Sequence, residues 1–175
     1  IITREEDRNV RAIVVYESLW GNTATIARAV AEGIGPDARP LTTDEATPAV
    51  VAEADLIVAG APVLGFRLPS DAIRASIATS EREAPAPPDL SHPSMRTWLA
   101  GLPAGHAGAA AFETRFRWSP GGATGGIESG LKGAGYRTMA KAQKFVVTGK
   151  YGPLREGEVE RARRWGEELA RALAS

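Results

Sequence analysis

A short polar loop between an apolar run and a helical pattern carries groups that could bind an anion. The loop spans residues 18–23 and reads SLWGNT. The hydroxyls of Ser18 and Thr23 can donate hydrogen bonds, and Gly21 lets the backbone approach a bulky ligand closely. A helix that begins here would add unpaired N–H groups and a partial positive charge, which favour phosphate. The loop is therefore predicted to bind a phosphate group.

A simpler alternative for this loop is that Ser18 and Asn22 only cap the helix that follows. The two common nucleotide motifs do not account for it. No G-x-G-x-x-G follows the apolar run, and no G-x-x-x-x-G-K-[ST] occurs, since the stretch GGIESGLKG places Lys132 at the wrong spacing. The loop is therefore neither a dinucleotide fingerprint nor a Walker loop.

The loop needs a strand before it and a helix after it, and the flanking residues predict both. Ala12–Tyr16 is a short apolar run typical of a strand. Residues 23–32 place Ile26 and Val30 on one face of a helix. Three helix breakers are expected to end this helix: Gly33, Gly35 and Pro36.

The rest of the chain alternates strands with helices. Further strands are predicted at residues 38–42, 56–60 and 107–112, with a fifth strand in two pieces at 136–139 and 144–148. Further helices are predicted at residues 70–79, 96–102, 124–134 and 156–174. This alternation predicts an α/β fold of three layers, with a parallel sheet between two layers of helices.

The length and composition limit the classes of function. The 175 residues fit one domain over residues 10–175, with residues 1–9 as a flexible N-terminal arm. Lys plus Arg equals Asp plus Glu, at 21 each, which argues against a nucleic-acid binder. No cysteine is present, so disulfides and thiol catalysis are excluded and redox chemistry would need a bound cofactor.

Other classes are disfavoured by missing patterns. No apolar run approaches the about 20 residues that span a bilayer. The charged N-terminus lacks the apolar core of a signal peptide, and we expect a cytoplasmic protein. His92 and His106 have no acidic partner at a metal-ligand spacing, so no metal site is expected.

From the first strand through the first helix, the chain resembles the flavodoxin signature position by position. The matching residues are Val14, Val15, Tyr16, Ser18, Gly21, Thr23, Ala27 and Val30. The element order extends the resemblance to residues 11–174. The resemblance implies a doubly wound, five-stranded sheet in the family's order 2-1-3-4-5, with FMN at the switch point between the first and third strands. It also implies that the FMN phosphate is held by Ser18, Leu19, Trp20, Gly21, Asn22 and Thr23.

The resemblance further implies that two other loops hold the isoalloxazine ring. The second loop spans residues 60–70, and the third spans residues 112–122. The ring contacts expected from the second loop are Ala61, Pro62, Val63, Gly65 and Phe66. Those expected from the third loop are Glu113, Thr114, Phe116 and Trp118.

Several of these residues have two interpretations each. Gly65 is a candidate for the peptide that contacts flavin N5 and flips on reduction, or it is a plain turn glycine. Phe116 and Trp118 either stack on the flavin or pack on the core. Trp20 could cover the ribityl chain, the ring edge or only the helix start. Trp98 and Trp165 are expected in the core or at a partner surface.

The charges of the two ring loops differ from those of the flavodoxin electron carriers, which are acidic around the flavin. Here Arg67, Arg115 and Arg117 face a single acid, Glu113. Positive charge would favour the anionic reduced flavin or hold an anionic substrate, although these arginines could also be solvated surface residues. This difference favours an FMN-dependent oxidoreductase, of the quinone reductase or protoporphyrinogen oxidase kind, over a low-potential carrier.

Two other functions stay open: a pure electron carrier, and a flavin-free interaction or small-anion-binding domain. We expect no dedicated catalytic acid. The expected partners are a redox protein or a small-molecule acceptor, with no nucleic acid and no membrane span, and a homodimer is an option. The Pro-rich segment between Glu81 and Pro93 could gate the site or form an interface.

Overall fold

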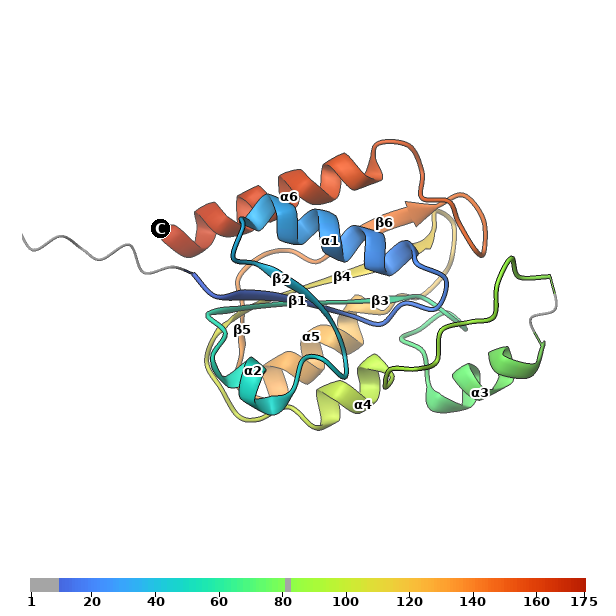
Figure 1. The fold of residues 1–175 in the computed structure, drawn as a ribbon, viewed down its shortest axis with the longest axis horizontal. Coiled ribbons are helices and arrows are strands. Elements are labelled where there is room, and N and C mark those ends of the chain that lie inside the picture. Colours follow the sequence, from blue (N-terminus) through green and yellow to red (C-terminus); the bar gives the residue numbers. More distant parts are fainter. Residues whose placement is uncertain (1–9, 81–82) are drawn as a thin grey trace, which may run out of the picture.

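A computed structural model describes residues 10–80 and 83–175 of the chain (Figure 1). The predicted flexible arm, residues 1–9, lies outside the described residues. The chain forms one parallel sheet in the order β2-β1-β3-β4-β5, with β6 also paired to β4. The predicted α/β class and the order 2-1-3-4-5 are therefore confirmed. The strands are β1 (Ala12–Tyr16), β2 (Arg39–Thr42), β3 (Leu56–Pro62), β4 (Gly108–Phe116), β5 (Arg137–Thr138) and β6 (Gln143–Val147).

The last strand is divided into two pieces, as the sequence predicts. β5 pairs with the start of β4, at Gly108 and Ala109, and β6 pairs with its end, from Phe112 to Phe116. Both pieces run parallel to β4 and together act as one interrupted edge strand. β6 is counted as a sixth strand beyond the five of the predicted order.

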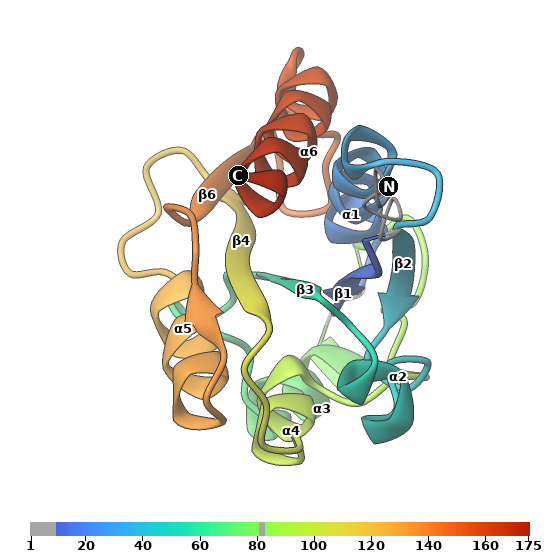
Figure 2. The same ribbon diagram turned by 90° about the vertical axis from the view of Figure 1, so that its left-hand side faces the viewer.

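Helices cover both faces of the sheet, and one hydrophobic cluster fills each side (Figure 2). α1 and α6 lie on one face, while α2, α4 and α5 lie on the other. α3 lies beyond the carboxyl ends of the strands (Figure 1). Alternate residues of β1 divide between the two clusters, because successive side chains of a strand point to opposite faces. The helices are α1 (Asn22–Ile34), α2 (Pro48–Ala52), α3 (Asp71–Ser80), α4 (Met95–Ala100), α5 (Thr124–Gly133) and α6 (Glu158–Ala174).

α1 runs through Gly33 to Ile34, two residues beyond the predicted last residue, Glu32, so the expectation that Gly33 itself breaks the helix is wrong. A β-carbon at Gly33 would overlap the carbonyl oxygen of Arg163, and one at Gly166 would overlap the carbonyl oxygen of Val30. Both glycines thus let α1 and α6 pack backbone against backbone. Gly33 serves this contact, and Gly35 is the C-cap.

β4 and α2 differ most from the predicted elements, while the bounds of the other elements agree to within two residues. β4 continues four residues beyond the predicted end at Phe112, so Glu113, Thr114 and Phe116 belong to the strand and not to the loop after it. The short helix α2 was not predicted, since five residues are too few to show a helical period. Its start signals are nevertheless present: Thr47 accepts a hydrogen bond from the Val50 amide, and Pro48 follows the cap.

No helix within residues 10–80 and 83–175 combines the length and apolar character needed to cross a membrane.

Candidate functional site

The carboxyl ends of β1, β3 and β4 bring the three predicted loops to one edge of the sheet. Tyr16 of β1 lies beside Gly60 of β3, and Gly60 lies beside Phe112 of β4. Since β1 has β2 on one side and β3 on the other, the strand order reverses here. Ligands of open α/β sheets bind outside the strand ends at such a switch point.

The side chain of Ser18 organises the first loop. Its Oγ accepts hydrogen bonds from the amides of Gly21, at 3.1 Å, and Ala24, at 3.2 Å. Gly21 is the N-cap residue of α1 and has φ of 101°, in the left-handed region that favours glycine. The capping role suggested for Asn22 is therefore wrong: Asn22 is the first helical residue, and in the first turn Ser18 caps the amide of Ala24.

The first loop offers a row of unused backbone donors. Within the described chain, the amides of Leu19, Trp20, Asn22 and Thr23 have no hydrogen-bond acceptor. A β-carbon added at Gly21 would have no atom within 4 Å, so the space beside the loop is open. Free amides at a helix N-terminus beside open space fit the binding of a phosphate.

Thr23 links the first loop to β4. Its Oγ1 lies 2.8 Å from Oγ1 of Thr114, and both side chains are buried. The structure thus brings together two predicted site residues that are 91 positions apart in the sequence. Either hydroxyl could donate in this pair, so the other can turn its proton towards a ligand.

Trp20 lies on the outer side of the first loop. Its Nε1 donates to the carbonyl of Ala86 at 3.1 Å. Its ring packs edge-on against Tyr151, with 4.8 Å between the ring centroids. These contacts place it between the Pro-rich segment and the segment that follows β6.

The second and third loops lie side by side. The amide of Val63 donates to the carbonyl of Thr114 at 2.9 Å, and the amide of Gly122 donates to the carbonyl of Phe66 at 3.1 Å. Gly65 and Phe66 have φ of 60° and 64°, so two successive residues adopt the left-handed region. That conformation is unusual for phenylalanine and marks a strained turn. The flavin contact of Gly65 stays a prediction.

Three aromatic side chains of these loops face solvent. Trp118 is 84% exposed, Phe66 64% and Phe116 45%. The alternative that Phe116 and Trp118 pack on the core is therefore wrong. By contrast, Trp98 and Trp165 are buried, as expected of core residues. The guanidinium of Arg117 lies 4.8 Å from the ring centroid of Trp118.

Glu113 and Arg115 form a buried ion pair, with 2.9 Å between Oε2 and the guanidinium. Glu113 also accepts hydrogen bonds from the amides of Ala123 and Thr124, at the start of α5. Arg115 donates to the carbonyls of Ser119 and Gly121. The prediction that Arg115 is a free positive charge beside the ring is thus wrong. This pair holds the third loop in shape, and of the three arginines in the two ring loops Arg67 and Arg117 are exposed.

Three further residues lie next to the first loop: Glu17, Arg74 and His92. No role in the site was predicted for them. Arg74 pairs with Glu17 at 2.7 Å, and the Nε2 of His92 accepts the amide of Ser18 at 3.1 Å. All three are buried. The one signal in the sequence was the position of Glu17, a charged residue directly between a buried strand and the loop.

Comparison with solved structures assigns the fold. Over 94% of this chain and 99% of the other, an archaeal flavodoxin superposes with a TM-score of 0.66 at 20% sequence identity. The chain has the flavodoxin-like fold. Oxidised flavodoxin 1 from Bacillus cereus matches with a TM-score of 0.62 and 16% identity, over 91% and 97% of the two chains.

A larger protein contains the same fold as one part. The chain covers 36% of a flavodiiron core from Synechocystis, with 94% of its own length aligned, a TM-score of 0.59 and 18% identity. No protein-family model matches the sequence. No curated protein matches it either. At these identities the likeness concerns the fold alone.

The cavity at the switch point of this flavodoxin-like fold is small. Residues of all three loops line a space of ≈ 50 Å³, among them Trp20, Thr23, Val63 and Phe116. Pockets that enclose a drug-sized ligand measure about 300–1,000 Å³. The loop amides therefore fit the phosphate of FMN, while its ring would have to lie against the exposed aromatic side chains or separate the loops.

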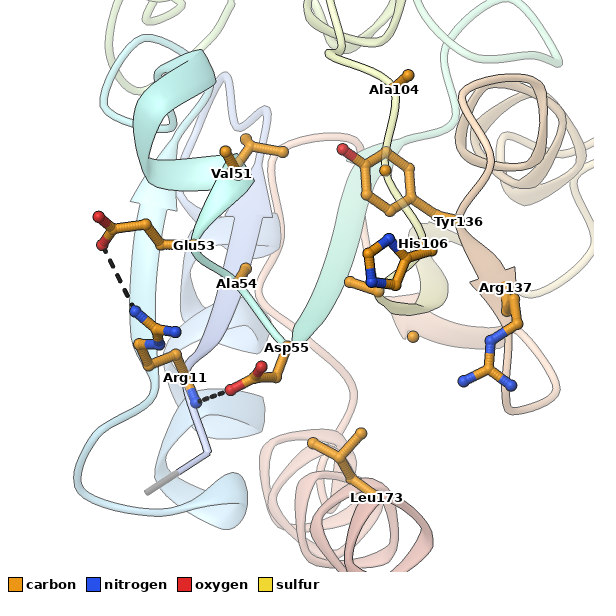
Figure 3. A pocket seen from close by; sticks show the side chains of 14 residues that line it. Arg11, Val51, Glu53, Ala54, Asp55, Ala104, His106, Tyr136, Arg137 and Leu173 are labelled. Atoms are coloured by element: carbon orange, nitrogen blue, oxygen red, sulfur yellow. Dashed lines mark hydrogen bonds and ion pairs between the residues drawn. The ribbon is translucent and has the colours of Figure 1, made fainter. Parts of the chain in front are cut away.

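A roomier cavity of ≈ 400 Å³ lies at the opposite edge, at the amino ends of the strands (Figure 3). Its polar groups are largely engaged: the Tyr136 hydroxyl donates to the carbonyl of Pro103 at 2.7 Å, and Asp55 accepts the amide of Arg11 at 3.0 Å. Ligands of this fold class bind at the other edge, outside the carboxyl ends of the strands. We therefore place the site at the carboxyl edge despite its smaller cavity.

No group of three or more His, Asp or Glu side chains that could hold a metal ion occurs in the part of the chain that the structure describes.

Proposed function

We propose that the protein binds FMN through its first loop and uses the flavin as an oxidoreductase cofactor. The observation that carries this proposal is the row of free amides at residues 19, 20, 22 and 23, at the N-terminus of α1 and at the switch point of a flavodoxin-like sheet. The sequence signature of residues 14–30 supports it independently. Bound FMN would supply one- and two-electron chemistry.

The chain's own residues bind and orient the cofactor. The amides of the first loop and the α1 terminus hold the phosphate dianion by charge-assisted hydrogen bonds. Phe66, Phe116 and Trp118 offer apolar faces on which the isoalloxazine can stack and be shielded from water. The predicted contacts from Ala61, Pro62 and Val63 belong to the same proposal.

Exposed positive charge supports an oxidoreductase rather than a low-potential carrier. Arg67 and Arg117 lie on the two ring loops, and the negative charge of Glu113 is neutralised by Arg115. A net positive surface beside the ring stabilises an anionic reduced flavin and attracts an anionic substrate. We infer a small-molecule acceptor of the quinone or tetrapyrrole kind, in a cytoplasmic protein.

The variant Thr23→Val tests phosphate recognition. It removes a hydroxyl beside the phosphate but keeps the shape of the side chain, so we expect FMN to bind about tenfold more weakly while riboflavin changes less than about twofold. Quenching of flavin fluorescence measures both affinities. Thr138→Val, an exposed threonine of β5, is the matched control and should change neither.

Equal losses for FMN and riboflavin would show that the loop does not read the phosphate. Absence of binding at micromolar FMN would contradict the flavin proposal as a whole. The small cavity would then favour the second candidate, a domain that binds a small anion without flavin. Titration with inorganic phosphate, read by the amide NMR shifts of Leu19 and Thr23, would test that candidate directly.

Reduction by NAD(P)H alone separates an enzyme from a carrier. A flavin that stays oxidised until a partner reductase is added would identify the protein as a carrier. Bleaching of the flavin by NAD(P)H alone supports the oxidoreductase.

A further inference from the structure

The Pro-rich segment, of which residues 83–93 are described, binds three successive residues of the first loop. The amide of Ser18 donates to Nε2 of His92 at 3.1 Å, and the amide of Asp89 donates to the carbonyl of Leu19 at 2.8 Å. The indole of Trp20 donates to the carbonyl of Ala86. The described part of the segment is therefore attached to the loop at three points, which argues against a loosely attached gate.

The hydrogen bond that His92 accepts determines which nitrogen of its ring carries the proton. Nε2 receives a hydrogen bond from the Ser18 amide, so the ring is neutral and its proton lies on Nδ1. That Nδ1 is buried and has no hydrogen-bond partner among the described residues. The nearest carboxylate oxygen, Oδ1 of Asp89, is 3.8 Å away. A buried donor without a partner is unfavourable, so the neighbouring structure must hold the ring in place.

Two charged residues hold His92 against the loop. Arg74, on α3, donates to the carbonyl of His92 and pairs with the carboxylate of Glu17 at 2.7 Å. The second oxygen of Glu17 accepts the amide of Met95 at 2.8 Å. Glu17 directly precedes the first loop, so the backbone on both sides of the Ser18–His92 hydrogen bond is tied to the same buried ion pair.

The amides of the loop form two sets. Those of Ser18 and Gly21 are used internally, while those of Leu19, Trp20, Asn22 and Thr23 are free for a ligand. Without an acceptor, the buried Ser18 amide would be unpaired, and the loop would have to move to satisfy it. The Ser18–His92 bond therefore fixes the loop backbone that carries the four free amides.

We propose that His92 is a positioning residue of the first loop, and that it couples anion binding there to the order of the Pro-rich segment. This rests on the proposed function, in which the loop binds the phosphate of FMN. Because the loop is ordered before the ligand arrives, less conformational entropy is lost on binding. By linkage, a bound anion in turn orders residues 83–93.

The first experiment needs no flavin. ¹⁵N NMR of the flavin-free protein should show His92 protonated at Nδ1 and unprotonated at Nε2, with a coupling across the hydrogen bond from the Ser18 amide. Addition of inorganic phosphate should slow hydrogen exchange of the Asp89 amide. A His92 ring protonated at Nε2 would overturn the proposal, whether or not the protein binds FMN.

The second experiment compares two variants of His92. Leucine removes the acceptor and keeps the volume, and we expect His92→Leu to weaken FMN about tenfold while riboflavin changes less than about threefold. The side chain of glutamine places an oxygen near the position of Nε2, so His92→Gln should restore most of the FMN affinity. His106→Leu, an exposed histidine at the opposite edge, is the control and should leave both affinities unchanged.

Equal losses in the leucine and glutamine variants would overturn the positioning role, as would an unchanged ratio of FMN to riboflavin affinity in His92→Leu. Circular dichroism checks that both variants fold, and the NMR measurement on the unmodified chain decides the question if His92→Leu does not. Failure of the unmodified protein to bind FMN, with the Ser18–His92 bond intact, would instead contradict the proposed function.

Discussion

Three buried glutamates stabilise the segments around the strand ends, and each is satisfied in the same way. Their exposed fractions are 2% or less. Each is paired with an arginine: Glu17 with Arg74, Glu113 with Arg115, and Glu158 with Arg161. Each also accepts at least one backbone amide hydrogen bond. A buried carboxylate needs such partners, because removal from water is otherwise costly.

The pH dependence of stability tests whether the charge of Glu158 stabilises the fold. Burial raises the pKa of its carboxyl group, but hydrogen bonds from Arg161 and the Val146 amide outweigh this, and the pKa is lowered from its usual value of 4.5. A lowered pKa stabilises the fold above pH 4.5, and this stability is lost as pH falls through the folded-state value. We expect Glu158→Gln to lose about 1–3 kcal/mol of unfolding free energy at pH 7 and less at pH 3, which lies below the unfolded-state pKa.

Urea unfolding at both pH values measures this difference. Glu167→Gln, on the exposed side of the same helix, is the control and should change stability by less than about 0.5 kcal/mol. An equal loss at pH 7 and pH 3 would mean that the charge of Glu158 does not stabilise the fold.

The pairing of α1 with α6 depends on glycines at the helix contact. These helices pack so closely that a methyl group at either Gly33 or Gly166 would overlap a carbonyl oxygen of the other helix. The position of α1 matters for function, since its N-terminus forms the first loop. Glycine in a helix interior is destabilising by itself, and here the close packing compensates for that.

We expect Gly33→Ala to lower the free energy of unfolding by about 1–3 kcal/mol, because the added methyl group forces the helices apart. Gly133→Ala, in α5, places a methyl group in open space and should instead stabilise by about 0.4–1 kcal/mol. Thermal unfolding of both variants provides the measurement. A Gly33→Ala protein as stable as the parent would refute the close contact.

The topology of the whole sheet assembles the site from distant parts of the chain. Residues 18–23, 60–70 and 112–122 meet because β1, β3 and β4 are adjacent and parallel. A ligand that contacts all three loops would therefore stabilise the entire folded state, and not only the segment that it touches. Binding to the folded state alone raises stability by mass action.

FMN should accordingly protect the protein against global unfolding. At a free concentration 100 times Kd, we expect a gain of about 2.7 kcal/mol, and a smaller gain with riboflavin at the same concentration. Urea denaturation followed by far-UV circular dichroism measures both gains. Identical midpoints with and without saturating FMN would contradict binding at the three loops.

The sequence alone predicted the elements and the first loop well, because their signals are local. The apolar run of residues 12–16, the helical spacing of Ile26 and Val30, and the loop between them lie within about twenty residues of one another. Strand order came from a resemblance carried by this same stretch, and the structure confirms it. Periodicity could not reveal the five-residue helix α2 or the extension of β4.

Only the tertiary structure decided which polar groups are free and which are already paired. The sequence predicted Arg115 as a positive charge beside the flavin ring, but in the fold it is buried and paired with Glu113 and the third loop. The acceptor of the Ser18 amide, His92, lies 74 positions away, on a segment whose role the sequence left open. Such pairings depend on chain topology, since residues far apart in sequence become neighbours only when the sheet has formed. Local composition predicted a phosphate-binding loop, and long-range contacts determined which of its amides are free.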